Sequence, residues 1–124
     1  QLTNINGTLF FSAQDGAHGY ELWKSDGTSA GTTLVKDIYS GSSSSFPEQL
    51  TNINGTLFFS AQDGAHGYEL WKSDGTSAGT TLIKDIYSGS SGSGPLYLTN
   101  VNGTLFFSAF EDNSGTELWK ILPN

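Results

Sequence analysis

The stretch that decides the fold is QLTNINGTLFFSAQDGAHGYELWKSDGTSAGTTL, residues 1–34, because it recurs without change at residues 49–82. The period is 48 residues, and a third copy begins with LTNVNGTLFFSA at residue 98 and regains ELWK at residues 117–120. Self-similarity at a fixed period of this length predicts a repeat architecture. The expected units are residues 1–48, 49–96 and 97–124. The first two units differ only at Val35/Ile83, Ser44/Gly92, Phe46/Gly94 and Glu48/Leu96.

Each period contains four strand-sized segments, which in the first copy are residues 2–5, 8–13, 20–25 and 32–38. Turn-forming residues separate them. Asn6-Gly7 is a strong hairpin signal, because a type I′ turn needs positive φ at both central residues. The other two connections are rich in Asp and Gly, which also favour turns. The unit is therefore predicted to be a four-stranded antiparallel meander.

The predicted strands are apolar on both faces. Leu9 and Phe11 point to one side of their strand and Phe10 to the other, so both faces of the sheet must be covered. Successive copies are expected to stack face to face. Four short strands in a period of this length predict an all-β fold made of β-propeller blades, with residues 39–48 crossing from one blade to the next. An open β-solenoid is the alternative.

Aromatic residues at equivalent positions of the three copies are expected to pack between blades rather than to bind ligands. They are Phe10, Phe11, Trp23, Phe58, Phe59, Trp71, Phe106, Phe107 and Trp119.

The third copy lacks the fourth strand, so the count is eleven strands and the ring is predicted to be incomplete. The last strand then forms an exposed apolar edge, which proteins cover by pairing. This expected assembly edge comprises Thr116, Glu117, Leu118, Trp119, Lys120, Ile121 and Leu122. Further repeats of a longer parent chain, a strand from a second copy of the chain, or a swapped segment would supply the missing strand. The apolar ending Ile121-Leu122-Pro123 in place of Ser-Asp-Gly predicts a natural C-terminus, and the missing initiator Met predicts that an upstream segment was removed.

Composition excludes several classes of partner. The chain of 124 residues has a formal net charge of -7, with five Lys and no Arg, so we expect no nucleic-acid binding. No run of about 18 apolar residues and no basic amphipathic stretch is present, which predicts that the chain neither spans nor coats a membrane. Cysteine is absent, which excludes disulfides and thiolate metal sites.

GYELWKSDGTSAGTTLVKDI, residues 19–38, and its second copy resemble the ELWxxDGT repeat proteins, a family of bacterial repeat proteins of which most are predicted to be secreted. LFFSAQDG followed by YELWKSDGT is more loosely similar to a WD-repeat blade. The third copy lacks DGT, so the resemblance there rests on Glu117-Leu118-Trp119. The resemblance implies a secreted or surface propeller array and brings no catalytic residues. The extracellular prediction also agrees with the Gly/Ser/Thr/Asn-rich composition.

Aspartates in the turns are candidate calcium ligands, since carboxylate oxygens suit that ion. They are Asp15, Asp26, Asp63 and Asp74, with Asp37 and Asp85 as further members. Asp before Gly also suits a turn, and no dense D-x-D-x-D-G array is present. Turn chemistry is the favoured interpretation, and no cofactor is expected.

A possible ligand rim comprises His18 with Tyr20 and His66 with Tyr68. Such a rim would suit sugars or respond to pH. Neither histidine has an evident nucleophile or orienting partner in the sequence, so a solvated loop histidine is the favoured interpretation. Asn-Gly-Thr sequons at Asn6, Asn54 and Asn102 are explained by the hairpin requirement rather than by glycosylation.

Three functions follow in order of preference. The first is a non-enzymatic extracellular structural or adhesive module that self-assembles into a ring or filament. The second is a multivalent glycan-binding propeller, in which repeated weak sites gain avidity. An enzyme ranks last, because identical repeats present a symmetric rim rather than a funnel of unlike polar groups.

Overall fold

The computed structural model describes residues 2–84, 92–111 and 115–121. These residues form an all-β protein of three antiparallel sheets and no helix. The first sheet comprises β1 (Leu2–Ile5), β2 (Thr8–Ala13), β3 (Glu21–Ser25) and β4 (Thr32–Lys36). The second comprises β5 (Glu48–Ile53), β6 (Thr56–Ala61), β7 (Glu69–Ser73) and β8 (Thr81–Lys84). The third comprises β9 (Leu96–Val101), β10 (Thr104–Glu111) and β11 (Gly115–Ile121).

Strand order within each sheet follows the chain, so each sheet is a meander, as predicted. The Asn-Gly connections are confirmed as turns with positive φ at both residues, 53° and 89° at Asn6 and Gly7. The same turn joins β5 to β6 and β9 to β10. The side chain of Asn4 supports the first turn by accepting a hydrogen bond from the Gly7 N–H at 2.9 Å.

The fourth strand is shorter than its sequence predicts. β4 ends at Lys36 rather than Ile38. The reason lies in β3, where the Glu21 carboxylate accepts the Ile38 N–H at 2.8 Å and turns that backbone group away from strand pairing. A side chain thus defines where the strand ends.

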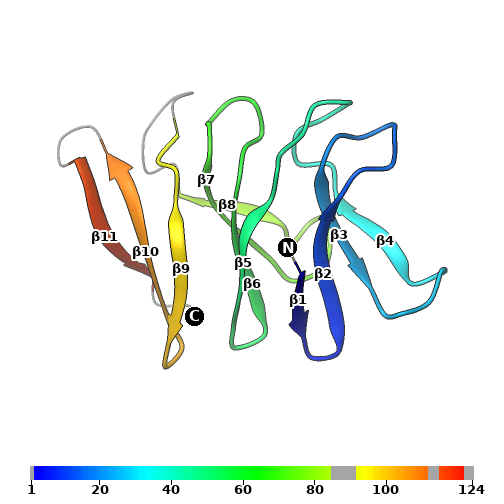
Figure 1. Ribbon diagram of the computed structural model, residues 1–124, viewed down its shortest axis with the longest axis horizontal. Coiled ribbons are helices and arrows are strands. Elements are labelled where there is room, and N and C mark those ends of the chain that lie inside the picture. Colours follow the sequence, from blue (N-terminus) through cyan, green and yellow to red (C-terminus); the bar gives the residue numbers. More distant parts are fainter. Residues whose placement is uncertain (1, 85–91, 112–114, 122–124) are drawn as a thin grey trace.

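The three sheets stand side by side in chain order (Figure 1), and apolar side chains fill the two junctions between them. The face that each sheet turns towards the next one along the chain is here called its leading face, and the opposite face its trailing face. At the first junction, Phe10 and Leu22 from the leading face of the first sheet belong to the same core cluster as Phe59 and Trp71 from the trailing face of the second. Burying a large apolar side chain contributes about 1.5–3 kcal/mol.

The second junction repeats the first one with residues 48 positions later. Its core contains Phe58 and Leu70 from the second sheet and Phe107 and Leu105 from the third. Both faces of the second sheet are therefore covered, as its apolar strands predicted.

The first strands of the sheets, β1, β5 and β9, lie next to one another across the junctions. The Thr3 hydroxyl donates to the Leu50 carbonyl at 3.1 Å, and the Asn100 side-chain amide donates to the Asn52 carbonyl at 3.1 Å. The described residues do not close a ring. Among the same residues, no helix is long and apolar enough to cross a membrane.

Candidate functional site

Two buried glutamates accept hydrogen bonds from the segments that link one sheet to the next. Glu21, the first residue of β3, is fully buried. Its carboxylate accepts hydrogen bonds from the backbone N–H groups of Ile38 at 2.8 Å and Tyr39 at 3.2 Å. It also accepts the Ser45 hydroxyl at 2.6 Å and the Ser45 N–H at 3.3 Å.

The second sheet repeats this arrangement one period later. Glu69 is fully buried at the start of β7 and accepts the Ser93 N–H at 3.1 Å and the Ser93 hydroxyl at 2.5 Å. The pairs Glu21–Ser45 and Glu69–Ser93 are here called the Glu–Ser clasps.

Each clasp connects two sheets. Ser45 donates its N–H to the Tyr20 carbonyl of the first sheet at 3.0 Å, and its own carbonyl accepts the Gln62 N–H of the second sheet at 3.1 Å. Ser93 likewise accepts the Phe110 N–H of the third sheet at 2.8 Å. The linker serine is therefore one point at which consecutive sheets are tied together.

The chemistry of the clasp is structural. Burial raises the pKa of Glu21, and hydrogen bonds from Ser45, Ile38 and Tyr39 act in the opposite direction. Four donors occupy the two carboxylate oxygens, which leaves little acceptor capacity for a metal ion or a substrate proton.

A signal for these glutamates is present in the sequence, although Glu21 and Glu69 are not among the predicted site residues. A carboxylate precedes Leu-Trp in every copy, at Glu21, Glu69 and Glu117, and an acidic residue in an apolar strand needs partners when buried. Glu117, the third copy, is exposed.

Within the described residues, the predicted aspartates lie in the connections between strands. Asp15 accepts the N–H groups of Ala17 at 3.0 Å and His18 at 2.8 Å, together with the His18 ring at 2.9 Å. Hydrogen bonds from the His18 backbone and ring and from the Ala17 N–H lower the pKa of Asp15 to about 2. Asp63 repeats these contacts with Ala65 and His66.

Asp26 and Asp74 close the DGT turns. The Asp26 carboxylate accepts the Thr28 hydroxyl at 2.7 Å and the Thr28 N–H at 2.9 Å. These bonds lower its pKa, and Asp74 has the same bonds from Thr76 and the same direction of shift. Asp37 accepts the Gly41 N–H at 3.0 Å, and Asp85 lies outside the described residues. Within the described ranges, no three His, Asp or Glu side chains gather where they could hold a metal ion.

The four residues of the predicted ligand rim each contact a different neighbouring side chain. His18 pairs with Asp15, and this contact raises the pKa of the histidine. Tyr20 stacks on Phe46 with ring centroids 5.6 Å apart. The Tyr68 hydroxyl accepts a long hydrogen bond of 3.4 Å from Gln62, and His66 pairs with Asp63.

The predicted packing aromatics divide into two groups. Six of them lie in the junction cores or pack against them, namely Phe10, Phe58, Phe59, Trp71, Phe107 and Trp119. The other three lie on the two end faces, Phe11 and Trp23 on the trailing face of the first sheet and Phe106 on the leading face of the third. They correspond by position to buried residues of the second sheet.

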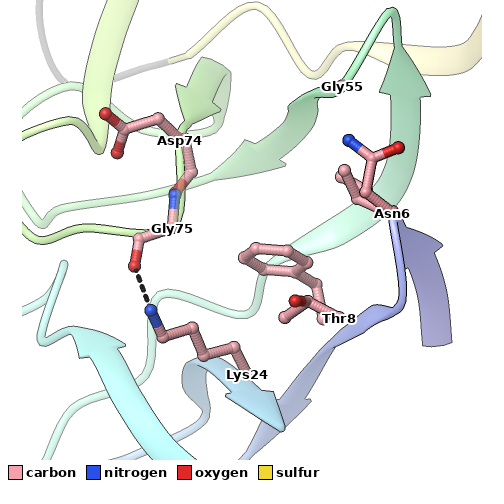
Figure 2. Close-up of a pocket in the computed structure, with 9 residues that line it drawn as sticks. Asn6, Thr8, Lys24, Gly55, Asp74 and Gly75 are labelled. Carbon is pink, nitrogen blue, oxygen red and sulfur yellow. Dashed lines mark hydrogen bonds between the residues drawn. The ribbon is translucent and has the colours of Figure 1, made fainter. Parts of the chain in front are cut away.

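A polar cavity of about 230 Å³ lies beneath the first junction. Figure 2 shows Lys24 reaching from the first sheet to the Gly75 carbonyl of the second, with Asn6 on the opposite wall. The Lys24 ammonium donates to that carbonyl at 2.8 Å. Asn-Gly and DGT turns border this cavity, so it lies at the opposite end of the meander from His18 and Tyr20.

A second, apolar hollow of about 520 Å³ lies on the leading face of the third sheet. Val101, Phe106 and Leu118 contribute to its lining. The predicted assembly edge runs beside it as β11, at the margin of the sheet, and its last member, Leu122, lies outside the described residues.

No family model, curated protein or solved structure matches this chain. The site must therefore be interpreted from its own geometry. That geometry contains two structural carboxylates, self-contained acidic turns and two open apolar faces.

Proposed function

We propose that this chain is a non-enzymatic structural repeat module of the propeller-blade type that associates with further copies of itself outside the cell. One observation carries the proposal. The second sheet has both faces buried between neighbours, whereas the first and third sheets each leave open a face made of equivalent residues. Large exposed apolar patches of this kind mark interaction sites.

The use of the polar side chains supports a structural role. The aspartates accept hydrogen bonds from their own turns, and Glu21 and Glu69 hold linkers. The pairs His18–Asp15 and His66–Asp63 each lie within one short turn, and the aspartate of each pair also accepts backbone N–H groups of that turn. These polar side chains therefore take part in hydrogen bonds that stabilise the turns and linkers of the fold.

The propeller type is supported by the four-stranded meanders and by the adjacency of β1, β5 and β9, which would form the innermost strands. The extracellular location is supported by the ELW and DGT motifs and by the Gly- and Ser-rich composition.

The oligomeric state tests the proposal. Sedimentation velocity and native mass spectrometry across a wide range of concentrations should give species heavier than the 13.2 kDa chain, with the mass rising as concentration increases. A single species of 13.2 kDa at every concentration would contradict it.

Glycan binding is a second candidate, favoured by the polar cavity beneath the first junction. Lys24, Asn6 and Thr8 offer donors and acceptors there, and Phe10 adds an apolar wall, a combination typical of small-molecule sites. A glycan array followed by calorimetry should then show saturable binding that Lys24→Met abolishes. Absence of saturable binding would exclude this candidate.

A further inference from the structure

We propose that a second copy of this chain binds head to tail, with the leading face of the third sheet of one copy packed on the trailing face of the first sheet of the next. This inference rests on the proposed function and assigns its interface. A second copy is the expected partner because each of the two internal junctions already joins a leading face to a trailing face of the next sheet.

The leading face of the third sheet repeats residue positions that are buried on the leading face of the second sheet, but here they are exposed. Leu70 is 0% exposed in the second junction, whereas its counterpart Leu118 is 73% exposed. Ile53 is likewise 0% exposed and its counterpart Val101 is 45% exposed. The same side-chain positions are thus covered in one sheet and bare in the other.

The trailing face of the first sheet is likewise exposed at positions that are covered on the trailing face of the second sheet. Leu57 is 0% exposed at the first junction, and its counterpart Leu9 is 37% exposed. Leu50 packs partly buried against the first core, whereas its counterpart Leu2 is 73% exposed. Both halves of a junction are therefore present at opposite ends of one molecule.

The shape of the open face fits the same occupant. Val101, Phe106 and Leu118 line the hollow of about 520 Å³. At the internal junctions, the equivalent space is filled by the trailing-face aromatics of the next sheet, such as Phe59 and Trp71. Phe11 and Trp23 of a second copy stand at those positions.

A polar contact would fix the register. At the first junction, the Lys24 ammonium donates to the Gly75 carbonyl at 2.8 Å. Lys120 occupies the position of Lys24 in the third sheet, and Gly27 occupies that of Gly75 in the first. In the assembly, Lys120 of one copy therefore donates to the Gly27 carbonyl of the next.

Because the two faces differ, the contact is heterologous, and it propagates into a ring or a fibre. This geometry differs from strand addition at the edge of β11, which would extend one sheet instead of covering its face. The two modes can be separated by mutation.

The test uses two variants, each of which disables one end. Val101→Glu with Leu118→Glu blocks the leading face, and Leu2→Glu with Leu9→Glu blocks the trailing face. All four residues are exposed in the single chain, so circular dichroism should match the wild type, and so should thermal melting at concentrations too low for assembly. Ser77→Glu with Ala78→Glu, in the exposed turn before β8, adds the same charge as a control.

Sedimentation of each end-blocked variant alone should give a monomer, and an equimolar mixture should give a 1:1 dimer that grows no further. The control should assemble as the wild type does. Lys120→Met in the partner with the open leading face should weaken the dimer by about tenfold, as expected for a hydrogen bond from a charged donor. Lys72→Met, on the exposed surface of the middle sheet, should leave its affinity unchanged.

The possible failures are distinguishable. A wild type that stays monomeric overturns both this interface and the proposed function. A wild type that assembles while either end-blocked variant assembles equally well overturns the head-to-tail interface alone and points to pairing at the β11 edge.

Discussion

The Glu21 carboxylate accepts the Ile38 N–H at 2.8 Å, across 17 residues of chain and at the point where β4 ends. Through Ser45, the same carboxylate reaches the linker that contacts the second sheet. One buried side chain therefore ends a strand and positions the crossover that follows it.

Glu21→Ala should lower the free energy of unfolding by about 3 kcal/mol, because several buried donors lose their acceptor at once. Glu69→Ala should have a similar effect through Ser93. Urea denaturation of the two variants measures the loss. The control is Glu117→Ala, where the side chain is exposed and a change within about 0.5 kcal/mol is expected. Equal effects at Glu21 and Glu117 would show that the clasp does not stabilise the fold.

The clasp should also give an unusual pH dependence. Because burial raises the pKa of Glu21 above 4.5, the native state binds this proton more readily than the unfolded state does. The contribution is fully present below pH 4.5 and is lost as the pH rises through the native pKa. The stability of the wild type relative to Glu21→Gln should therefore increase from neutral pH down to 4.5. A difference that stays constant, measured by urea denaturation at each pH, would contradict the shift.

The Asp15–His18 pair should titrate as a unit. The hydrogen bond from Asp15 raises the pKa of His18 above 6.5, and hydrogen bonds from His18 and Ala17 lower that of Asp15 to about 2. The pair therefore supports its turn between pH 3.8 and 6.5, and this support is lost as His18 deprotonates above that window and as Asp15 protonates near pH 2. Asp15→Asn should return the His18 pKa towards 6.5 in an NMR titration. Asp26→Asn, in another turn, should leave it unchanged, and identical His18 curves in wild type and Asp15→Asn would refute the coupling.

Much of the fold could be predicted because its information is local. The Asn6-Gly7 hairpin follows from φ preferences alone, and strand positions follow from apolar segments between turn signals. The repeat then predicts the long-range arrangement. Phe10 and Phe58 occupy equivalent positions of two copies, so each is expected to pack against equivalent residues of the next sheet. The eleven strands among the described residues and the face-to-face packing of the sheets follow from these two features.

The clasps could not be predicted in the same way. Glu21 meets Ser45 across 24 residues, and no periodicity within one strand marks that pairing. An acidic residue between apolar neighbours is equally compatible with an exposed edge, which is how Glu117 is found. Only the three-dimensional path of the linker distinguishes these two environments.

The DGT turn offers a test of steric coupling between Asp26 and Gly31. A Cβ on Gly31 would lie 2.0 Å from the Asp26 Oδ1 atom, which is the atom that accepts the Thr28 hydroxyl. Gly31→Ala should cost about 1–3 kcal/mol because the carboxylate must move and lose these bonds. In an Asp26→Ala background the same change should cost about 1 kcal/mol less, since the obstacle is gone. Urea denaturation of the double-mutant cycle measures this difference, and Asp74→Ala with Gly31→Ala, placed in separate turns, should be additive. If the Asp26 cycle were additive as well, the Asp26 carboxylate would not be the obstacle to an alanine at position 31. Its close approach to the added Cβ would then have no energetic consequence.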